Sequence, residues 1–599
     1  MTLGQTRKAP YQDARLATEG RVEDLLARMT LPEKAGLMFH QMIEIGEKGT
    51  LAGPSSAYAL PGTEDMLLNK HINHFNVLHG SDPATMARWN NCLQESALST
   101  RLGIPVTLST DPRHAFTDNP GASFTAGSFS QWPESLGLAA IRDEGVVERF
   151  ADIARQEYLA VGLRVALHPQ VDLATEPRWA RIGGTFGEDA ELTSRLLRAY
   201  IRGFQTGRLG HASVATMTKH FPGGGPQKDG EDPHFPYGRE QVYPGRNFDY
   251  HLRPFEAAFE AGTSQIMPYY GMPVGTQYEE VAFGFNEGII TGLLRKKYGF
   301  TGIVCADWCL INDSVVWGEP QAARAWGVEH LSPLDRLEKA VSAGVDQFGG
   351  EHCPELLIEL VNSGRLSESR LDASVRRLLR EKFVLGLFDN PFVDAEAADG
   401  IVAQRSFVEA GYEAQCQSLT ILSNGTHGEV LPIAGQPRIY VLNVDRSVAA
   451  RYGTVVNEPE EAELAVVRIK APFEPRAGAF EQFFHAGSLE FTAEEVRSIL
   501  ELCRKVPTVV DIYLDRPAVI PEISRSAAAV VANYGASDSA LFDVLFGRRS
   551  ARGTLPFDLP SSMRAVAASR SDVPFDTEAP LFRFGHGLVI GGDETHVRR

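Results

Sequence analysis

Short apolar runs alternate with stretches of helical periodicity over the first two-thirds of the chain. Such alternation is typical of βα units whose strands form a parallel sheet. The runs rich in apolar residues are 73–78, 105–108, 164–167, 214–217, 264–267, 302–305 and, more weakly, 344–348. We therefore predict an α/β fold with a (β/α)8-type barrel. Seven runs are one fewer than that barrel needs, which leaves a modified barrel open.

Residues that start and stop helices separate these runs. Asp82 before Pro83 is a typical N-cap followed by a first helical residue. The segment 371–385 has helical spacing and ends before a glycine. A stretch containing Pro, Asp and Ala follows it. We therefore place the barrel domain at 1–390 and a linker at 391–404.

The last third of the chain returns to the same alternation. Its strand-like runs are 438–442, 464–469, 508–513 and 528–532. Thr492 and Glu495 have the spacing of a capping box, which predicts a helix before the third of these runs. We expect a second α/β domain at 405–599, built as a layered sandwich.

Composition and charge narrow the class of protein. The chain has 599 residues, 43% hydrophobic and 22% charged, as in ordinary globular proteins. A net charge of −18 disfavours a nucleic acid partner. No apolar run is long enough to cross a membrane, and residues 1–20 lack the apolar stretch of a secretory signal. The six cysteines are scattered, without a CxxC pair or an HExxH motif. We expect reduced thiols, no metal and a cytoplasmic location.

Polar side chains follow most of the predicted barrel strands. In (β/α)8 barrels the functional residues lie at the carboxyl ends of the strands. Packing alone does not explain so many reactive side chains at these positions. In chain order they are Asp111, Asp172, Arg178, Lys219, His220, Tyr269, Tyr270 and Asp307.

The segment GFTGIVCADWCLIND brings Asp307 to the end of an apolar run, with Trp308 beside it. A carboxylate at this place can attack an anomeric carbon, and an indole can pack on the apolar face of a sugar. The alternative is that Asp307 only caps a helix at the barrel rim.

Three other strand ends suggest groups that bind sugar hydroxyls. Lys219 and His220 are adjacent donors before three glycines, which suit close backbone approach to a ligand. Arg178 can donate a fork of hydrogen bonds to vicinal hydroxyls, and Asp111 can accept from two of them. The alternatives are a solvated loop for the Lys-His pair and a turn for Asp111. We interpret three neighbours of Arg178 as scaffold ion pairs: Arg181, Glu188 and Asp189.

These segments together resemble glycoside hydrolase family 3, the β-glucosidase and β-xylosidase family. The resemblance covers nearly the whole chain. The matching motifs, in order, are RVEDLLARMTLPEKAGLM, RLGIPVTLSTD, EPRWARIGGTFGED, TKHFPGGG, QIMPYYG, GFTGIVCADW, AVSAGVDQF, SRLDASVRRLLREKFVLGLFDNP, LFGRRSARGTLPFDLP and FRFGHGL.

The resemblance implies a barrel followed by an α/β sandwich, with the active site between them. It implies that Asp307 is the nucleophile and Trp308 its neighbouring tryptophan. By the same resemblance, Tyr270 is a tyrosine that contacts the nucleophile, with Met267 three residues before it. The residues it implies for holding the sugar at subsite −1 are Asp111, Arg178, Lys219 and His220.

The general acid/base is where the chain departs from the family pattern. Many relatives have a glycine-glutamate pair after a strand of the second domain, but this chain has Lys-Ala there, in VVRIKAPFEPR. Glu474 is the nearest carboxylate and our predicted acid/base, with Glu481 and Glu490 as further options. The family's bacterial β-N-acetylglucosaminidases instead use an Asp-x-His dyad, which resembles Asp232 and His234 here.

The resulting prediction is a retaining, exo-acting β-glucosidase that acts by double displacement and needs no cofactor. β-Xylosidase and β-N-acetylhexosaminidase are the alternatives within the family. From other classes, an inactive sugar-binding protein and, less well supported, a metal-dependent barrel enzyme stay open. The expected partner is a small carbohydrate or glycoside. The sequence leaves the oligomeric state open, with a homodimer as one option.

Overall fold

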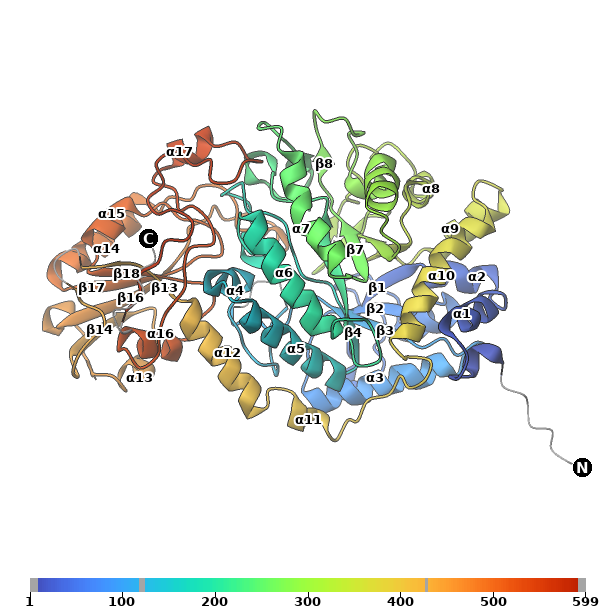
Figure 1. Ribbon diagram of the computed structural model, residues 1–599, viewed down its shortest axis with the longest axis horizontal. Helices are drawn as coiled ribbons and strands as arrows, with labels where there is room; N and C mark the ends of the chain where they lie inside the picture. Colours follow the sequence, from blue (N-terminus) through green and yellow to red (C-terminus); the bar gives the residue numbers. More distant parts are fainter. Residues whose placement is uncertain (1–8, 118–123, 426–428, 591–599) are drawn as a thin grey trace, which may run out of the picture.

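The computed structural model describes residues 9–117, 124–425 and 429–590 (Figure 1). Eight parallel strands form a closed barrel in the order β1-β12-β9-β7-β5-β4-β3-β2, which confirms the predicted barrel. The strands are β1 (Phe39–Ile43), β2 (His74–Val77), β3 (Thr107–Thr110), β4 (Leu163–Ala166), β5 (Ala215–Phe221), β7 (Gln265–Pro268), β9 (Ile303–Ala306) and β12 (Gln347–Gly349).

Strand β1 is the one that the hydrophobic pattern missed. It pairs in parallel with β2 on one side and with β12 on the other, and so closes the barrel. Its sequence includes His40, whose buried ring contacts the Ser109 hydroxyl at 2.7 Å and the Gln347 side chain at 3.2 Å inside the barrel. Because this strand places polar side chains in the core, it lacks an apolar run.

Helices surround the barrel, and α5, α6 and α7 lie side by side on one flank (Figure 1). Helix α3 starts as predicted, because the Asp82 carboxylate accepts from the Thr85 N–H at 2.8 Å. The main barrel-domain helices are α1 (Thr18–Leu26), α2 (Leu31–Leu37), α3 (Pro83–Leu98), α4 (Ser135–Ile141), α5 (Glu144–Ala160), α6 (Ala190–Gln205), α7 (Phe248–Glu260), α8 (Pro333–Ala343), α9 (Pro354–Asn362) and α10 (Glu368–Val384).

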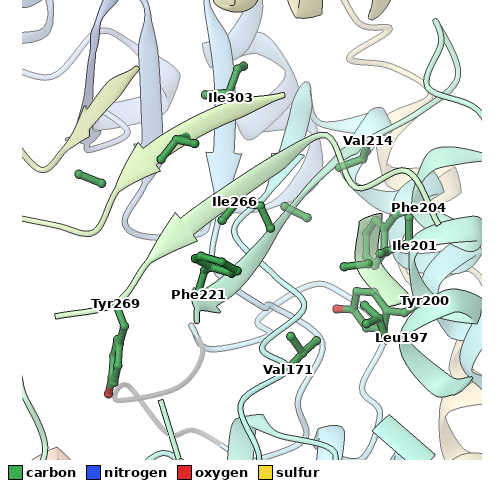
Figure 2. Close-up of a cluster of buried hydrophobic side chains, with 14 of the residues drawn as sticks. Val171, Leu197, Tyr200, Ile201, Phe204, Val214, Phe221, Ile266, Tyr269 and Ile303 are labelled. Carbon is green, nitrogen blue, oxygen red and sulfur yellow. The ribbon is translucent and has the colours of Figure 1, made fainter. Parts of the chain in front are cut away.

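Apolar packing against the surrounding helices fixes the end of β5. Figure 2 shows the buried side chains of this region, including Tyr200 and Phe204 from α6 and Phe221 from β5. Phe221 is fully buried and meets the Phe255 ring edge-on at 5.2 Å. This contact anchors the strand immediately after the predicted Lys219-His220 pair.

The second domain is a six-stranded sheet in the order β13-β18-β17-β16-β14-β15, with only β13 antiparallel to its neighbour. The hydrophobic pattern missed β13, which ends in polar residues, and β15, which has two residues. The strands are β13 (Thr420–Asn424), β14 (Arg438–Leu442), β15 (Thr454–Val455), β16 (Leu464–Lys470), β17 (Thr508–Tyr513) and β18 (Ala529–Asn533).

Helices cover both faces of this sheet, as expected for a layered sandwich (Figure 1). Alternate residues of β17 belong to different cores: Val510 packs in the cluster that contains Ile499 of α14, and Val509 in the one that contains Leu541 of α16. The helices of this part are α11 (Ala398–Ile401), α12 (Arg405–Ser418), α13 (Arg446–Ala449), α14 (Ala493–Lys505), α15 (Pro521–Ser526), α16 (Asp538–Leu545) and α17 (Met563–Ala568). The predicted linker 391–404 lies between α10 and α12 and contains α11.

The C-terminal segment returns to the barrel and joins the two domains. The Glu188 carboxylate accepts from the backbone N–H groups of Asp558 at 2.6 Å and Phe575 at 2.7 Å. Asp189 instead caps α6 by accepting from the Leu192 N–H. Both residues are structural, as expected, although they bind backbone groups rather than forming ion pairs.

Two further findings bear on the class of protein. All six cysteines are free, and four of them are buried. Among the described residues, no helix combines the length and the apolar character needed to span a membrane.

Candidate active site

A cavity of about 380 Å³ opens at the carboxyl ends of the barrel strands. The barrel provides most of its lining, and Phe480 and Phe484 come from the second domain, in the loop 471–490 after β16. The charged and histidine side chains that line it are His79, Asp111, Arg113, Arg181, Lys219, His220, His234, Asp307 and Arg324.

Loop 471–490 is anchored at its base by the buried Arg516. The guanidinium donates to the carbonyl oxygens of Pro472 at 2.6 Å and Ala486 at 3.0 Å within the loop. It also donates to the Arg178 carbonyl of the barrel at 2.9 Å. One side chain thus ties this loop to both domains.

Asp307 follows β9 and presents one uncommitted oxygen. Its Oδ1 accepts from the Trp308 N–H at 2.8 Å, which fixes the carboxylate plane. Its Oδ2 is buried and has no hydrogen-bond partner among the residues that the structure describes. The nearest cationic candidate is His220, whose Nε2 lies 4.0 Å away. A buried, oriented carboxylate oxygen beside a cavity can act as a nucleophile.

Asp111, after β3, and Lys219, in β5, form an ion pair at the same end of the barrel, on the two strands that flank β4. The Lys219 ammonium donates to Asp111 Oδ1 at 2.8 Å, and the Asn76 amide donates to Oδ2 at 3.2 Å. Burial raises the pKa of Asp111, but the Lys219 charge and these hydrogen bonds outweigh it, so the net pKa is lowered. The carboxylate is therefore ionised and can accept from sugar hydroxyls.

His220 is held by a carboxylate from the preceding strand end. Asp172 accepts from His220 Nδ1 at 2.7 Å and from the His220 backbone N–H at 3.1 Å. Burial lowers the pKa of His220 and outweighs Asp172, which acts to raise it. The Nδ1 proton thus points to Asp172, which leaves Nε2 for the cavity.

The glycine run after His220 packs against the chain rather than against a ligand, contrary to our expectation. A Cβ at Gly225 would lie 1.7 Å from the Leu173 carbonyl, and one at Gly224 would lie 2.7 Å from the Tyr269 ring. The Gly224 N–H also donates to Asp172 at 2.6 Å. These glycines therefore help to hold the carboxylate that orients His220.

The structure exchanges the roles predicted for Arg178 and Arg181. Arg178 is not among the cavity residues, because its guanidinium binds the Glu176 carboxylate at 2.8 Å. Arg181, which we interpreted as scaffold, lines the cavity and is buried. Burial lowers the pKa of Arg181, but Tyr269, Asp232 and other acidic neighbours together have the larger, opposite effect. The net pKa is therefore raised. Arg181 is therefore a cation at the cavity wall.

Three further sequence candidates lie together at the cavity. Met267, Tyr270 and Trp308 all line it. The Tyr270 hydroxyl donates to the Trp308 carbonyl at 2.8 Å, so it supports the backbone that presents the nucleophile candidate. The Trp308 indole fits against Gly349, where an added Cβ would lie 2.5 Å from the ring.

Comparison with known proteins agrees with this geometry. The sequence model of the Glycosyl hydrolase family 3 N terminal domain matches residues 63–381, and that of the C-terminal domain matches residues 310–590. The chain belongs to glycosyl hydrolase family 3. It is therefore a glycoside hydrolase by family, and the predicted two-domain architecture is confirmed.

Two curated relatives match nearly the full length of this family 3 chain. "Probable beta-glucosidase C" of Aspergillus oryzae is 55% identical, with 96% of this chain and 91% of the relative covered. "Periplasmic beta-glucosidase/beta-xylosidase" of Dickeya chrysanthemi is 44% identical, with 97% and 91% covered. A solved β-glucosidase from Erythrobacter marinus shares the fold, with a TM-score of 0.78 at 20% identity, and the match covers 97% of this chain and 84% of that one.

None of the three predicted glutamates lines the cavity of this family 3 hydrolase. Glu474 is exposed, pairs in an isolated bridge with Ala486 and accepts from the Ser488 N–H at 3.1 Å. Glu481 accepts from the Tyr237 hydroxyl, and Glu490 is exposed. The structure thus gives no support to Glu474 as a group that touches the substrate.

The Asp232–His234 pair does reach the cavity, through the His234 ring. Asp232 is buried and accepts from His234 Nδ1 at 2.5 Å and from the Trp179 indole at 3.3 Å. The ring packs against Tyr270 and Phe484, each at 4.7 Å. Burial lowers the pKa of His234, and Asp232 opposes that effect. With Nδ1 engaged, Nε2 is the nitrogen that can exchange a proton with a ligand.

Sequence reasoning missed Arg324 altogether. Its buried guanidinium lines the cavity, with Cζ 5.7 Å from the centre of the Tyr270 ring. It lies in the long connection between barrel strands β9 and β12, away from the end of any barrel strand and from any motif that we recognised. The sequence offered no local pattern that distinguishes it from a surface arginine.

Proposed function

We propose that the chain is a retaining, exo-acting β-glucosidase. The observation that supports this most strongly is the buried Oδ2 of the cavity-lining Asp307, which has no hydrogen-bond partner among the described residues. In double displacement, this oxygen attacks the anomeric carbon and forms a covalent glycosyl-enzyme, which water then hydrolyses with retained configuration.

The terminal sugar would be held by the polar groups around Asp307. Asp111 accepts from hydroxyls, while Lys219 and Arg181 donate to them. His220 contributes through Nε2, because its Nδ1 is bound to Asp172. Hydrogen bonds to sugar hydroxyls that strengthen as positive charge develops on the ring lower the barrier of the chemical step.

The Asp232–His234 pair would act as general acid and base in place of Glu474. As acid, the His234 imidazolium, which Asp232 stabilises, gives its Nε2 proton to the glycosidic oxygen and becomes a neutral imidazole. As base, it then removes a proton from the water that attacks the intermediate. Support for this choice is the position of His234 on the cavity and the exposure of Glu474 away from it.

Glucose as the sugar is supported by the names of the relatives that are 44–55% identical over most of their length. The name of the Dickeya relative also includes β-xylosidase, so xylosides are the second candidate substrates. N-Acetylhexosaminides are the third, since an Asp-x-His dyad resembles that branch of the family. A cytoplasmic location, a free carbohydrate partner without nucleic acid, and the open oligomeric state, with a homodimer as one option, stay predictions.

The test is hydrolysis of a panel of 4-nitrophenyl β-glycosides, with NMR of the first sugar anomer released. We expect the highest kcat/KM on the β-glucoside and β-glucose as the first product. Release of α-glucose would contradict the retaining mechanism. Absence of turnover on every glycoside would favour the inactive sugar-binding alternative.

A further inference from the structure

Two buried tryptophans of the barrel domain donate to the segment that carries Asp232 and His234. The Trp179 indole N–H donates to Asp232 Oδ2 at 3.3 Å, and the Trp326 indole N–H donates to the Pro233 carbonyl at 2.8 Å. Trp179 lies between β4 and β5 in the chain, and Trp326 lies between β9 and β12. Two separate parts of the barrel domain therefore hold the proposed acid/base segment.

The two oxygens of the Asp232 carboxylate have different partners. Oδ1 accepts from His234 Nδ1 at 2.5 Å and from the His234 backbone N–H at 3.0 Å. Oδ2 accepts from Trp179, and the Tyr269 hydroxyl lies 3.5 Å from it. Because rotation of the carboxylate moves both oxygens, the donor to Oδ2 also fixes how Oδ1 meets the imidazole. An indole N–H suits this position, since it donates and accepts nothing from the pair.

Asp232 is ionised although it is buried. Burial raises the pKa of this carboxyl, but His234 and Arg181 outweigh that effect, and the net pKa is lowered. A buried carboxylate oxygen without a donor is costly. Without the Trp179 N–H, Oδ2 would keep only the longer contact with Tyr269 among the residues that the structure describes. The carboxylate would then be free to rotate, and the His234 ring would lose its fixed orientation.

The backbone on either side of Asp232 leaves no room for a side chain. Gly230 has a φ of +73°, and an added Cβ there would lie 2.5 Å from Arg178 Cβ and 3.0 Å from the Trp179 nitrogen. An added Cβ at Gly238 would lie 2.1 Å from the Asp232 carbonyl oxygen. Packing and hydrogen bonds thus fit the segment 230–238 to the barrel. An acid that is already fixed loses less entropy when the transition state forms.

We infer that Trp179 and Trp326 are positioning residues for the general acid/base. Their indole N–H groups carry this role, rather than the bulk of their rings. The inference rests on the proposed function, in which Asp232 and His234 form the acid/base pair. Neither tryptophan is among the described residues that line the cavity. Both therefore act through the acid/base segment and not on the substrate.

The experiment measures kcat/KM of Trp179→Phe and Trp326→Phe on methyl β-glucoside and 2,4-dinitrophenyl β-glucoside. Methanol needs a proton in order to leave, whereas dinitrophenolate departs as an anion. The ratio of the two kcat/KM values, methyl over dinitrophenyl, does not depend on the fraction of correctly folded enzyme in a preparation. We expect each variant to lower this ratio about three- to tenfold, the range of one neutral hydrogen bond.

The matched control is Trp89→Phe. Trp89 is buried, does not line the cavity, and its indole N–H has no hydrogen-bond partner among the described residues. This variant loses the same ring volume from the core but no hydrogen bond, so its ratio should stay at the wild-type value. A second control combines each phenylalanine substitution with His234→Ala. Neither substitution should lower the ratio further there, because the acid that it orients is gone.

Three results would overturn the inference: an unchanged ratio in either phenylalanine variant, an equal fall with and without His234, or an equal fall in Trp89→Phe. Two others would overturn the proposed function instead. A wild-type ratio in His234→Ala would exclude the Asp232–His234 pair as the acid/base. Failure of the wild type to hydrolyse either glucoside would exclude the glucosidase activity itself.

Discussion

Replacement of His234 by alanine tests the proposed acid most directly. The Asp232 carboxylate is buried and binds His234 Nδ1 at 2.5 Å, so the ring has one orientation and one free nitrogen. Removal of the ring removes the proton donor but leaves Asp307 and the sugar-binding groups in place. The defect should therefore depend on how much protonation a leaving group needs.

General acid catalysis contributes roughly 100- to 10,000-fold to such reactions, which corresponds to about 3 to 5.5 kcal/mol of barrier. Alkyl glucosides, whose leaving groups need a proton, should lose kcat/KM by that factor. 2,4-Dinitrophenyl glucoside should lose much less, because its leaving group departs as an anion. Part of any common loss would come from the ring packing against Tyr270 and Phe484.

The assay measures kcat/KM for a series of aryl and alkyl glucosides and plots its logarithm against the leaving-group pKa. We expect a steep negative slope for His234→Ala and a shallow one for the wild type. Added azide should raise turnover of activated substrates, because it replaces the water that needs a base. Glu474→Ala, at an exposed position, is the comparison and should keep the shallow slope. A steep slope in Glu474→Ala with a wild-type slope in His234→Ala would refute the assignment.

The other predictions concern the nucleophile, the sugar site and stability. Asp307→Asn should lower kcat by roughly a hundredfold or more without unfolding the protein, since it removes the attacking oxygen; residual activity near wild type would exclude it. Lys219→Ala and His220→Ala should each lower kcat/KM by about 10- to 150-fold, the value of a hydrogen bond to a charged group of about 1.5 to 3 kcal/mol; normal values in both would make the pair scaffold. Burial raises the pKa of Glu134 from 4.5 to about 8. Between these two pH values the folded protein holds the Glu134 proton, whereas the unfolded chain has released it. The contribution of Glu134 to the free energy of unfolding is therefore complete below pH 4.5 and is lost as pH rises towards 8. The free energy of unfolding, measured with urea across that range, should depend less on pH in Glu134→Gln than in the wild type. The same pH dependence in both proteins would contradict the reasoning.

The sequence predicted the barrel and the side chains at its strand ends for a simple physical reason. A parallel strand buried on both faces has an apolar run, and the residue after the run must lie at the barrel mouth. Asp111, Lys219, His220 and Asp307 all follow this rule and reach the cavity. Strand β1 does not follow it, because polar side chains fill its part of the core.

The errors occurred where position depends on contacts between distant segments. Arg178 and Arg181 are three residues apart in one motif, and only the binding of the first to Glu176 separates their roles. Glu474 is the nearest carboxylate to the expected place, yet its bridge with Ala486 leaves it on the surface. Neither outcome can be read from local spacing.

The anchoring of loop 471–490 by Arg516 has a consequence for how new variants of this enzyme could arise. The groups around Asp307 belong to the barrel alone, while Phe480 and Phe484 belong to the second domain. The Arg516 guanidinium helps to hold their loop in register with the barrel, together with the ion pair between Arg476 and Glu231. Recombination that exchanges the second domain as a whole, Arg516 included, would carry a different cavity wall onto an unchanged glucose site. Exchange of the loop alone would have to preserve the carbonyl groups that this arginine binds.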